Sequence, residues 1–258
     1  MTIGIRGLGL IGGSFEKAFA RAGHNVLDLK DAPAAAVRSC SVVIVCLPPR
    51  LVVPWILQHA GDFAENAIVT DAAGVKQAIC DGLSAVAGKS KWSFVGGHPM
   101  AGKECSGYAN ATADLFVRAS MIFTPYESTP ASVVERLRNL FAEIGFTRFV
   151  TTTPSRHDEM IAYTSQLAHV VSSAYVRDAL SREHAGFSAG SFQDMTRVAS
   201  VDPDMWTDLF LYNANALDAV LTSLMARLRE YRDSIRAGDA AALRTLLAEG
   251  RKMKMEVK

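Results

Sequence analysis

Short apolar runs alternate with amphipathic stretches along the first 150 residues of the chain. The clearest run, Ser-Val-Val-Ile-Val-Cys-Leu at 41–47, is rich in β-branched residues, which is typical of a parallel strand buried on both faces. Further strands are predicted at 2–7, 24–29, 67–70, 92–95, 120–124 and 147–150, and helices at 12–22 and 132–144. This alternation predicts an α/β fold built on a doubly wound parallel sheet.

The pattern changes after Thr151-Thr152-Thr153-Pro154. From about residue 155 the strand signals nearly vanish, and apolar residues recur at helical spacing over 158–180, about 205–236 and 239–252. We therefore expect an α/β domain over residues 1–150 and an all-α domain over residues 151–258. The second domain is apolar along its length, which favours a homodimer formed through these helices.

Composition and charge narrow the class of protein. Of 258 residues, 49% are hydrophobic and 21% are charged, as in a globular protein with a large core. The net charge of +1 gives no electrostatic reason to expect nucleic acid or a membrane as a partner. The N-terminus lacks the pattern of a signal peptide, and no apolar run has the length of a membrane helix, so we expect a cytoplasmic location.

The cysteines give no sign of a metal site. Cys40, Cys46, Cys80 and Cys105 lack C-x-x-C spacing and have no evident histidine partner for zinc. We expect no metal and interpret the four as buried free thiols of a reducing compartment.

A glycine motif follows the first predicted strand. Gly7-Leu8-Gly9-Leu10-Ile11-Gly12 fits G-x-G-x-x-G and leads into the first predicted helix, which is the context that this motif needs. Gly7 makes the turn, Gly9 lets the backbone approach a pyrophosphate at the helix N-terminus, and Gly12 permits close helix–strand packing. The motif predicts that residues 7–12 bind a dinucleotide in a Rossmann-like domain.

The cofactor's adenosine end is expected at the end of the second strand. Lys30 takes the place that is usual for a carboxylate, between Asp28 and Asp31. Asp31 suits the ribose of NAD, whereas Lys30 suits the 2′-phosphate of NADP. All three also suit a solvated turn, which is the favoured interpretation for Asp28. We expect NAD or NADP, with NAD favoured.

The stretch Gly96-Gly97-His98-Pro99-Met100-Ala101-Gly102-Lys103-Glu104-Cys105-Ser106-Gly107 places one histidine and one glutamate among four glycines and a proline. Glycines let the backbone approach a ligand closely, and a histidine there exchanges a proton near neutral pH. We interpret this stretch as a proton-handling loop. Some ninety residues after a nucleotide-binding motif, it is typical of the chemical half of a dehydrogenase.

Other candidates have a plain interpretation beside the functional one. Asp71 follows a predicted strand and so lies at the sheet edge where ligands bind, but it also suits a helix cap. Ser165 and His169 are four residues apart, on one face of a helix, where a histidine is commonly a satisfied core residue. Arg197 also fits an ion-paired surface arginine, and Trp206 also fits a core aromatic.

These segments, in this order, resemble the prephenate/arogenate dehydrogenase family of tyrosine biosynthesis. The resemblance covers nearly the whole chain, at residues 7–14, 71–76, 96–107, 157–169 and 193–206. The glycine motif is shared by many enzymes. The combination of His98-Pro99-Met100-Ala101-Gly102 with the segment from Ser165 to His169 is much more specific.

The resemblance implies a role for each matching residue. His98 matches the catalytic histidine, and Ser165 and His169 match groups on the substrate side. Glu104 matches a residue near the mouth of the active site, and Arg197 matches the arginine that binds a substrate carboxylate.

Two more matches concern assembly, since Asp194 and Trp206 match positions by which the helical domain of a partner subunit borders the site. The implied assembly is a homodimer.

The chain departs from the family pattern in two places. Gly74 stands where the family usually has a serine, whose hydroxyl helps hold the catalytic histidine and the substrate. The segment from Lys30 to Ser41 is too short for the second helix and third strand of many relatives, so we expect a more open adenosine end.

The implied reaction is the oxidative decarboxylation of prephenate to 4-hydroxyphenylpyruvate, or of arogenate to tyrosine, with hydride transfer to the nicotinamide cofactor. One alternative is a β-hydroxyacid-type dehydrogenase, but the first long helix of the second domain carries Ser165 and His169 where that chemistry usually needs a lysine. Another alternative is an NAD(P)-binding regulator without activity, with which Gly74 is consistent.

Overall fold

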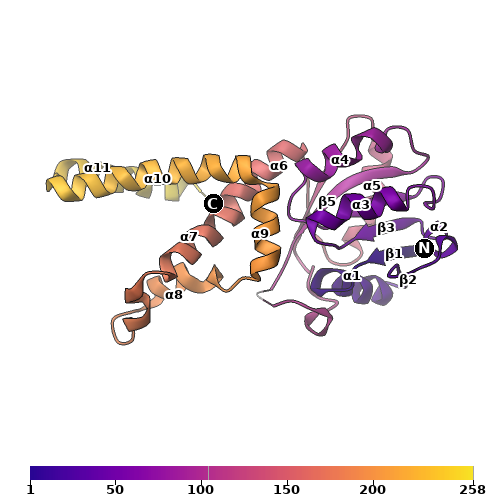
Figure 1. Cartoon of the computed structure of the whole chain (residues 1–258), viewed down its shortest axis with the longest axis horizontal. Coiled ribbons are helices and arrows are strands. Elements are labelled where there is room, and N and C mark those ends of the chain that lie inside the picture. The colour runs from indigo at the N-terminus through magenta and orange to yellow at the C-terminus, as the bar shows by residue number, and fades with distance from the viewer. Residues whose placement is uncertain (104, 258) are drawn as a thin grey trace. The chain divides into compact units, whose positions relative to one another are not determined.

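In the computed structural model, which describes residues 1–103 and 105–257, seven strands form one sheet in the order β2-β1-β3-β4-β5-β6-β7 (Figure 1). Their bounds are β1 (Thr2–Arg6), β2 (Asn25–Asp28), β3 (Val42–Val45), β4 (Ile68–Asp71), β5 (Ser93–Met100), β6 (Ser120–Pro125) and β7 (Arg148–Thr151). The predicted α/β fold with a nucleotide-binding type of sheet is confirmed.

The sheet is parallel from β2 through β5, but β6 pairs with β5 in the antiparallel direction, and β7 follows β6 in parallel. The expectation of a wholly parallel sheet was therefore wrong at this edge. An apolar run predicts a strand, and its direction depends on the connection that leads into it.

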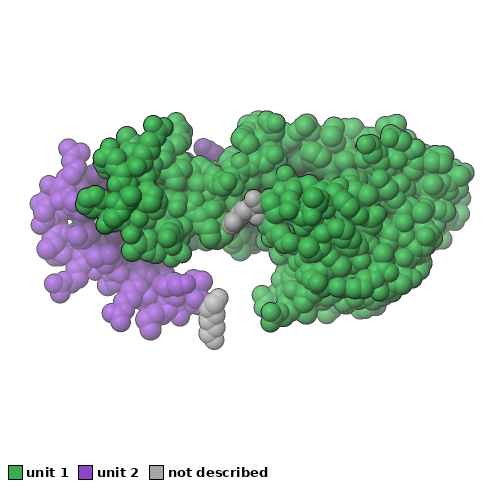
Figure 2. Space-filling view, turned by 90° about the horizontal axis from the view of Figure 1, so that it is seen from below, with its two compact units in different colours: residues 1–214 green, residues 215–258 purple. Residues whose placement is uncertain are grey.

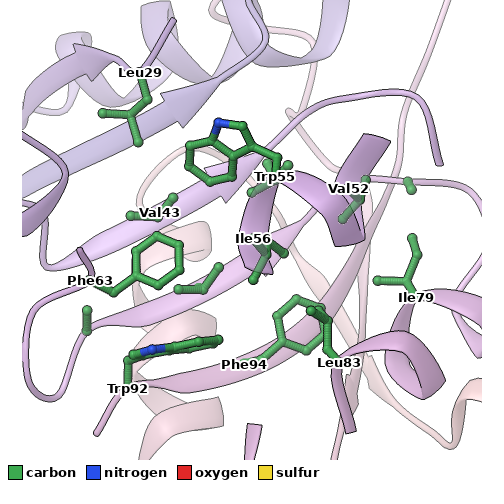
Figure 3. Close-up of a cluster of buried hydrophobic side chains, with 14 of the residues drawn as sticks. Leu29, Val43, Val52, Trp55, Ile56, Phe63, Ile79, Leu83, Trp92 and Phe94 are labelled. Atoms are coloured by element: carbon green, nitrogen blue, oxygen red, sulfur yellow. The ribbon is translucent and has the colours of Figure 1, made fainter. Parts of the chain in front are cut away.

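Helices cover both faces of the sheet. Their bounds are α1 (Leu10–Arg21), α2 (Ala34–Arg38), α3 (Pro49–Gln58), α4 (Gln77–Ala87) and α5 (Ala131–Ala142). On β3, Val43 and Val45 point into a core with α3 and α4, whereas Val42 and Ile44 point into a core with α1 and α5. Alternation across a strand buried on both faces explains the unbroken apolar run. The α3–α4 face packs large rings and aliphatic side chains together (Figure 3).

The chain after β7 is helical, as predicted. Its elements are α6 (Pro154–Ile161), the π-helical turn η2 (Ala162–Gln166), α7 (Leu167–Val176), α8 (Gly190–Thr196), α9 (Pro203–Tyr212), α10 (Ala214–Ala237) and α11 (Ala240–Glu256). Three short 3₁₀ turns are η1 (Tyr108–Asn110), η3 (Ala179–Glu183) and η4 (Arg197–Ala199). The single helix expected over about 205–236 is broken at Asn213, between α9 and α10.

The chain divides into two compact units, residues 1–214 and 215–258 (Figure 2). The first unit holds the sheet together with the helices from α6 to α9, and the second holds α10 and α11. In the second unit, the hydroxyl of Tyr231 on α10 donates to the carbonyl of Leu246 on α11, at 3.2 Å. The domain boundary near residue 150 stays a prediction.

Candidate active site

The turn between β1 and α1 carries the glycine motif. A Cβ on Gly7 would lie 2.4 Å from the carbonyl oxygen of Cys46, and one on Gly12 would lie 1.9 Å from that of Gly7, so the protein itself requires these two glycines. Gly9 differs, because a Cβ there meets no described atom within 4 Å and its φ of −90° is open to other residues. The space beside Gly9 is thus left for a ligand. No described side chain caps α1, so its first backbone N–H groups suit an anion.

The strand β2 ends at Asp28, whose Oδ1 accepts the backbone N–H of Lys30 at 2.9 Å. The side chains of Lys30 and Asp31 are exposed in the turn that follows, and Asp31 has a left-handed φ of 55°. The helix α2 has only five residues, in keeping with the short segment noted in the sequence. Both charges remain available to the cofactor's adenosine end.

Asp71, the last residue of β4, forms a buried ion pair with Lys76. Both side chains are 0% exposed. The Asp71 carboxylate also accepts the backbone N–H of Ala73 at 3.0 Å and that of Gly97 at 3.1 Å. A ligand would have to displace these partners to reach the carboxylate. Asp71 therefore joins the ends of β4 and β5, and its expected part in the ligand-binding edge of the sheet stays a prediction.

His98 lies in the strand β5, although the sequence suggested a loop. The pairing of β4 with β5 ends at Thr70 and Val95, and β5 continues to Met100 because β6 pairs with it, setting His98 opposite Ile122. A Cβ on Gly97 would lie 2.5 Å from the carbonyl oxygen of Asp71, so the approach of β4 to β5 requires that glycine. The catalytic candidate is thus held by a strand just past the carboxyl edge of the parallel sheet, where ligands bind in such folds.

A chain of hydrogen bonds runs from His98 into the helical segment. His98 Nδ1 lies 2.9 Å from His157 Nε2, and His157 Nδ1 lies 2.7 Å from an oxygen of Asp158. Both His157 and Asp158 are buried on α6, whereas His98 is partly exposed. The Cε1–Nε2 edge of His98 lies 3.8 Å from the position that a Cβ on Gly74 would take.

The first turn of α6 positions His157 and Asp158. Thr153 caps the helix by accepting the backbone N–H of Arg156, and Pro154 is the first helical residue. The carboxylate of Asp158 accepts the backbone N–H groups of Lys76 and Gln77 at 2.8 and 2.9 Å, where α4 begins. No role for His157 or Asp158 was predicted from the sequence. A histidine followed by an aspartate in the first helix of the second segment was the available signal.

Burial sets the protonation of both histidines. Loss of solvent, followed by the electrostatic effects of His157 and Lys76, holds the pKa of His98 well below 6.5. Loss of solvent also lowers the pKa of His157, against the opposing effect of its hydrogen bond to Asp158. His98 is therefore neutral at physiological pH, as a general base requires.

A second group of candidates lies on the following helices. His169 on α7 donates from Nδ1 to the carbonyl oxygen of Val198, 2.8 Å away in η4, and its ring contacts that of Trp206 on α9, with 3.7 Å between centroids. Arg197 precedes Val198 in the same short turn and is exposed. Ser165, one turn before His169, is partly buried in η2. The structure thus places His169, Trp206 and the backbone beside Arg197 together.

The helix α9 connects the two groups. Trp206 contacts His169, and Leu209, three residues later, lies 3.2 Å from the position that a Cβ on Gly74 would take. Gln166 donates to the carbonyl oxygen of Leu209 at 3.0 Å, and Asn213 donates to Gln166 at 2.8 Å and to the carbonyl oxygen of Asp158 at 2.9 Å. This network also was not evident in the sequence.

The remaining expected site residues are Asp194 and Glu104. Asp194 is exposed on α8. Glu104, expected near the mouth of the site, lies outside the residues that the structure describes.

The described residues, 1–103 and 105–257, contain no group of three or more His, Cys, Asp and Glu side chains arranged to hold a metal. No single helix among them is long and apolar enough to cross a membrane, although the bent pair α9 and α10 passes that test jointly. All four cysteines are free, but Cys105 is exposed and Cys46 only partly buried, which corrects the expectation of four buried thiols.

Comparison with known families matches most of the chain. The nucleotide-binding domain of prephenate dehydrogenase matches residues 8–150, and the dimerization domain of prephenate dehydrogenase matches residues 153–249. A prephenate dehydrogenase of Bacillus subtilis is 34% identical over 244 residues, which cover 84% of this chain and 65% of that protein. A cyclohexadienyl dehydrogenase of Zymomonas mobilis is 31% identical over 287 residues, covering 99% of this chain and 96% of that protein.

Solved structures share the fold along its length. The arogenate dehydrogenase of Synechocystis is 26% identical, with a TM-score of 0.84 and all of both chains covered. The prephenate dehydrogenase of A. aeolicus, in complex with hydroxyphenyl propionate and NAD+, is 27% identical, with a TM-score of 0.84, and the likeness covers 100% of this chain and 98% of that one.

Proposed function

The chain belongs to the prephenate dehydrogenase family, and we propose that it oxidises and decarboxylates prephenate to 4-hydroxyphenylpyruvate, or arogenate to tyrosine, with a nicotinamide nucleotide as hydride acceptor. Similar proteins are named prephenate, cyclohexadienyl and arogenate dehydrogenases. The observation that carries the proposal is the placement of a neutral histidine, His98, with its Nε2 edge beside Gly74 at the carboxyl edge of a nucleotide-binding sheet.

His98 acts as the base for the substrate's ring hydroxyl. As hydride leaves the carbon that bears this hydroxyl, the C–O bond becomes a ketone and the hydroxyl proton must pass to an acceptor. His98 takes the proton at Nε2, and a positioned base of this kind contributes typically ~10²–10⁴-fold to the rate. The ketone then serves as the electron sink for loss of carbon dioxide, and aromatisation of the ring drives that step.

The β1–α1 turn fits a dinucleotide. The open space beside Gly9 and the uncapped start of α1 suit a pyrophosphate, and Lys30 and Asp31 are exposed where the adenosine ribose is expected. When bound, the nicotinamide ring supplies the hydride acceptor. NAD+ occupies the A. aeolicus relative, which supports NAD as the cofactor here, with NADP as the alternative.

The substrate is held from the helical side. Arg197 binds a substrate carboxylate through a charge-assisted, bidentate pair. His169 and Trp206, which contact each other, form a wall of the pocket. Ser165 is a further group on the substrate side, and Glu104 is expected near the mouth of the site. Hydroxyphenyl propionate, which carries a carboxylate, is bound by the A. aeolicus relative and supports this class of substrate.

A matrix of two substrates and two cofactors tests the function. Purified protein is mixed with prephenate or arogenate and with NAD or NADP, and the absorbance of the reduced nicotinamide is followed. We expect turnover with at least one pair, with carbon dioxide released in equal amount. Tight nucleotide binding without turnover in all four mixtures contradicts the proposal and favours a non-catalytic regulator.

His98→Asn tests the base. We expect kcat to fall by ~10²–10⁴-fold, since asparagine accepts no proton, while nucleotide affinity is retained. The low pKa of His98 sets the sign of the pH dependence. The neutral form persists below pH 6.5, so kcat/KM of the wild type should hold to lower pH than an ordinary histidine allows and fall only as His98 becomes protonated. Near-normal turnover of the variant contradicts the assignment.

The helices after residue 153 form the subunit contact of a homodimer. The match to a dimerization domain over residues 153–249 supports this, as do the exposed apolar side chains on α10 and α11. In the dimer, Asp194 and Trp206 border the partner's site. The boundary between the nucleotide-binding and helical domains falls near residue 150, at the end of β7.

A further inference from the structure

We infer that His157 and Asp158 are positioning residues, which hold His98 in the tautomer that leaves Nε2 bare toward the substrate. The inference rests on the proposed function of His98 as the base. It follows from the directions of three hydrogen bonds that link β5, α6 and the start of α4.

The chain of bonds begins at Asp158. Its carboxylate accepts two backbone N–H groups, those of Lys76 and Gln77, which can only donate. Carboxylate oxygens that accept from two backbone donors offer only their remaining lone pairs to a third neighbour, toward which Asp158 is therefore the acceptor. That neighbour, His157 Nδ1, must carry the hydrogen in the 2.7 Å contact.

The same reasoning assigns the donor and acceptor atoms of the two imidazole rings. A neutral His157 that donates from Nδ1 has its lone pair on Nε2. His98 Nδ1 lies 2.9 Å from this Nε2, so His98 must donate from Nδ1, and its own lone pair falls on Nε2. This is the atom beside Gly74 that the proposed reaction needs as a proton acceptor.

The local charges favour this arrangement. The groups that face the two rings are Lys76 and Asp71, which pair with each other, and Asp158. When Nε2 of His98 takes the substrate's proton, the positive charge lies one imidazole away from the Asp158 carboxylate. The Nδ1 hydrogen of His98 stays shared with His157 Nε2, and no atom has to move to accommodate the charge.

Because residue 74 is a glycine, the orientation of the His98 ring depends on the contact at the opposite, Nδ1 side of the ring. Position 74 has no side chain that could orient the His98 ring, and the described ring contact of His98 is with His157, at 5.1 Å between centroids. The imidazole is therefore oriented from its Nδ1 side.

The tautomer can be read directly by nuclear magnetic resonance. Protein with isotope-labelled histidine gives two-bond nitrogen–proton correlations that distinguish a bare Nε2 from a protonated one. In the wild type we expect His98 and His157 both with hydrogen on Nδ1, the signals being assigned with His98→Asn and His157→Asn. A wild-type His98 that carries its hydrogen on Nε2 overturns the inference, whether or not the enzyme is active.

Two substitutions of His157 distinguish the effect of its hydrogen-bond acceptor from the effect of losing the imidazole ring. In His157→Gln the side-chain carbonyl can take the place of Nε2 and accept from His98, whereas in His157→Asn the shorter side chain cannot reach. We expect the asparagine variant to lose about 10²-fold or more in kcat, with KM changed less than about threefold, and the glutamine variant to stay within about tenfold of the wild type. Asp158 is left intact because it also caps α4.

The control is His59→Asn, which removes another histidine that is paired with a carboxylate, Asp62, at 3.0 Å. It should leave kcat and the His98 tautomer unchanged. Thermal unfolding and nucleotide binding show whether each variant is folded. A folded His157→Asn protein with normal turnover, or with Nε2 of His98 still bare, contradicts the inference. If the wild type turns over no substrate while Nε2 is bare, the proposed function fails and the positioning role stands.

Discussion

The sheet and the two C-terminal helices bury their apolar side chains to very different degrees. Phe15, Phe116 and Phe141 are fully buried between the sheet and its helices. Among the described residues of α10 only Leu217 is buried, and in α11 none is, while Leu228 and Ile235 are 57% and 63% exposed. The sheet region buries its apolar side chains within one chain, whereas α10 and α11 expose the apolar side chains through which we propose the homodimer to form.

The largest difference between the two regions should appear in stability. The Phe15 ring stacks on that of Phe116 at 4.2 Å and meets the edge of Phe141 at 5.5 Å. Phe15→Ala should lower the free energy of unfolding by ~3–5 kcal/mol because it opens a cavity in a packed core. Phe187→Ala, at a ring that is 94% exposed, is the matched control and should change it by less than ~0.5 kcal/mol. Urea unfolding followed by circular dichroism measures both, and equal losses would contradict the comparison.

A charge on the exposed face of α10 should act on assembly. Leu228→Glu places a carboxylate among Met225 and Ile235, and covering it in a dimer should weaken association by ~2 kcal/mol or more, about 30-fold. Ala226→Glu, on the opposite side of the same helix by its periodicity, is the control. Sedimentation at several concentrations should show the first variant dissociating while the control stays with the wild type. Identical behaviour of the two variants would move the subunit contact elsewhere.

The smallest effect is expected where the sheet region meets α9, at Gly74. Gly74→Ser would place a hydroxyl near the Nε2 edge of His98, and the tip of Leu209 at 3.2 Å need shift only slightly. One added hydrogen bond of ~1 kcal/mol should raise kcat/KM by about fivefold. Gly74→Ala adds the same Cβ without the hydroxyl and should not give this gain. Steady-state kinetics compares them, and a gain shared by both variants would show that packing is responsible.

The parts of the fold that depend on local pattern could be predicted. The β3 strand was evident because a strand buried on both faces needs an unbroken apolar run, and the turn at Gly7 and Gly12 followed from backbone contacts that only glycine allows. The direction of β6 could not be predicted, since strand propensity is the same in both directions. The extension of β5 through His98 depends on that antiparallel partner and was missed with it.

The site could be predicted only in part. His98, His169 and Trp206 were found as candidates through their setting and the family resemblance, and the contact between His169 and Trp206 is observed. The role of His157 depends on a hydrogen bond to His98, 59 positions away in the chain, and that of Asp158 on one to Lys76, 82 positions away. The local spacing of residues does not reveal such long-range bonds. The break at Asn213 was missed for the same reason, since its amide is bound to Asp158 and Gln166.

The carboxylate of Asp158 accepts bonds from the start of α4 and from the ring that orients the base. A substitution there removes a helix cap and the partner of His157 in a single step. A substitution of Asp158 is therefore expected to lower both stability and turnover. Selection for either property alone is then enough to retain the aspartate and, with it, the other property. Adaptation of the base to a new substrate is then left to positions such as 74, where a Cβ would lie 3.8 Å from the His98 ring.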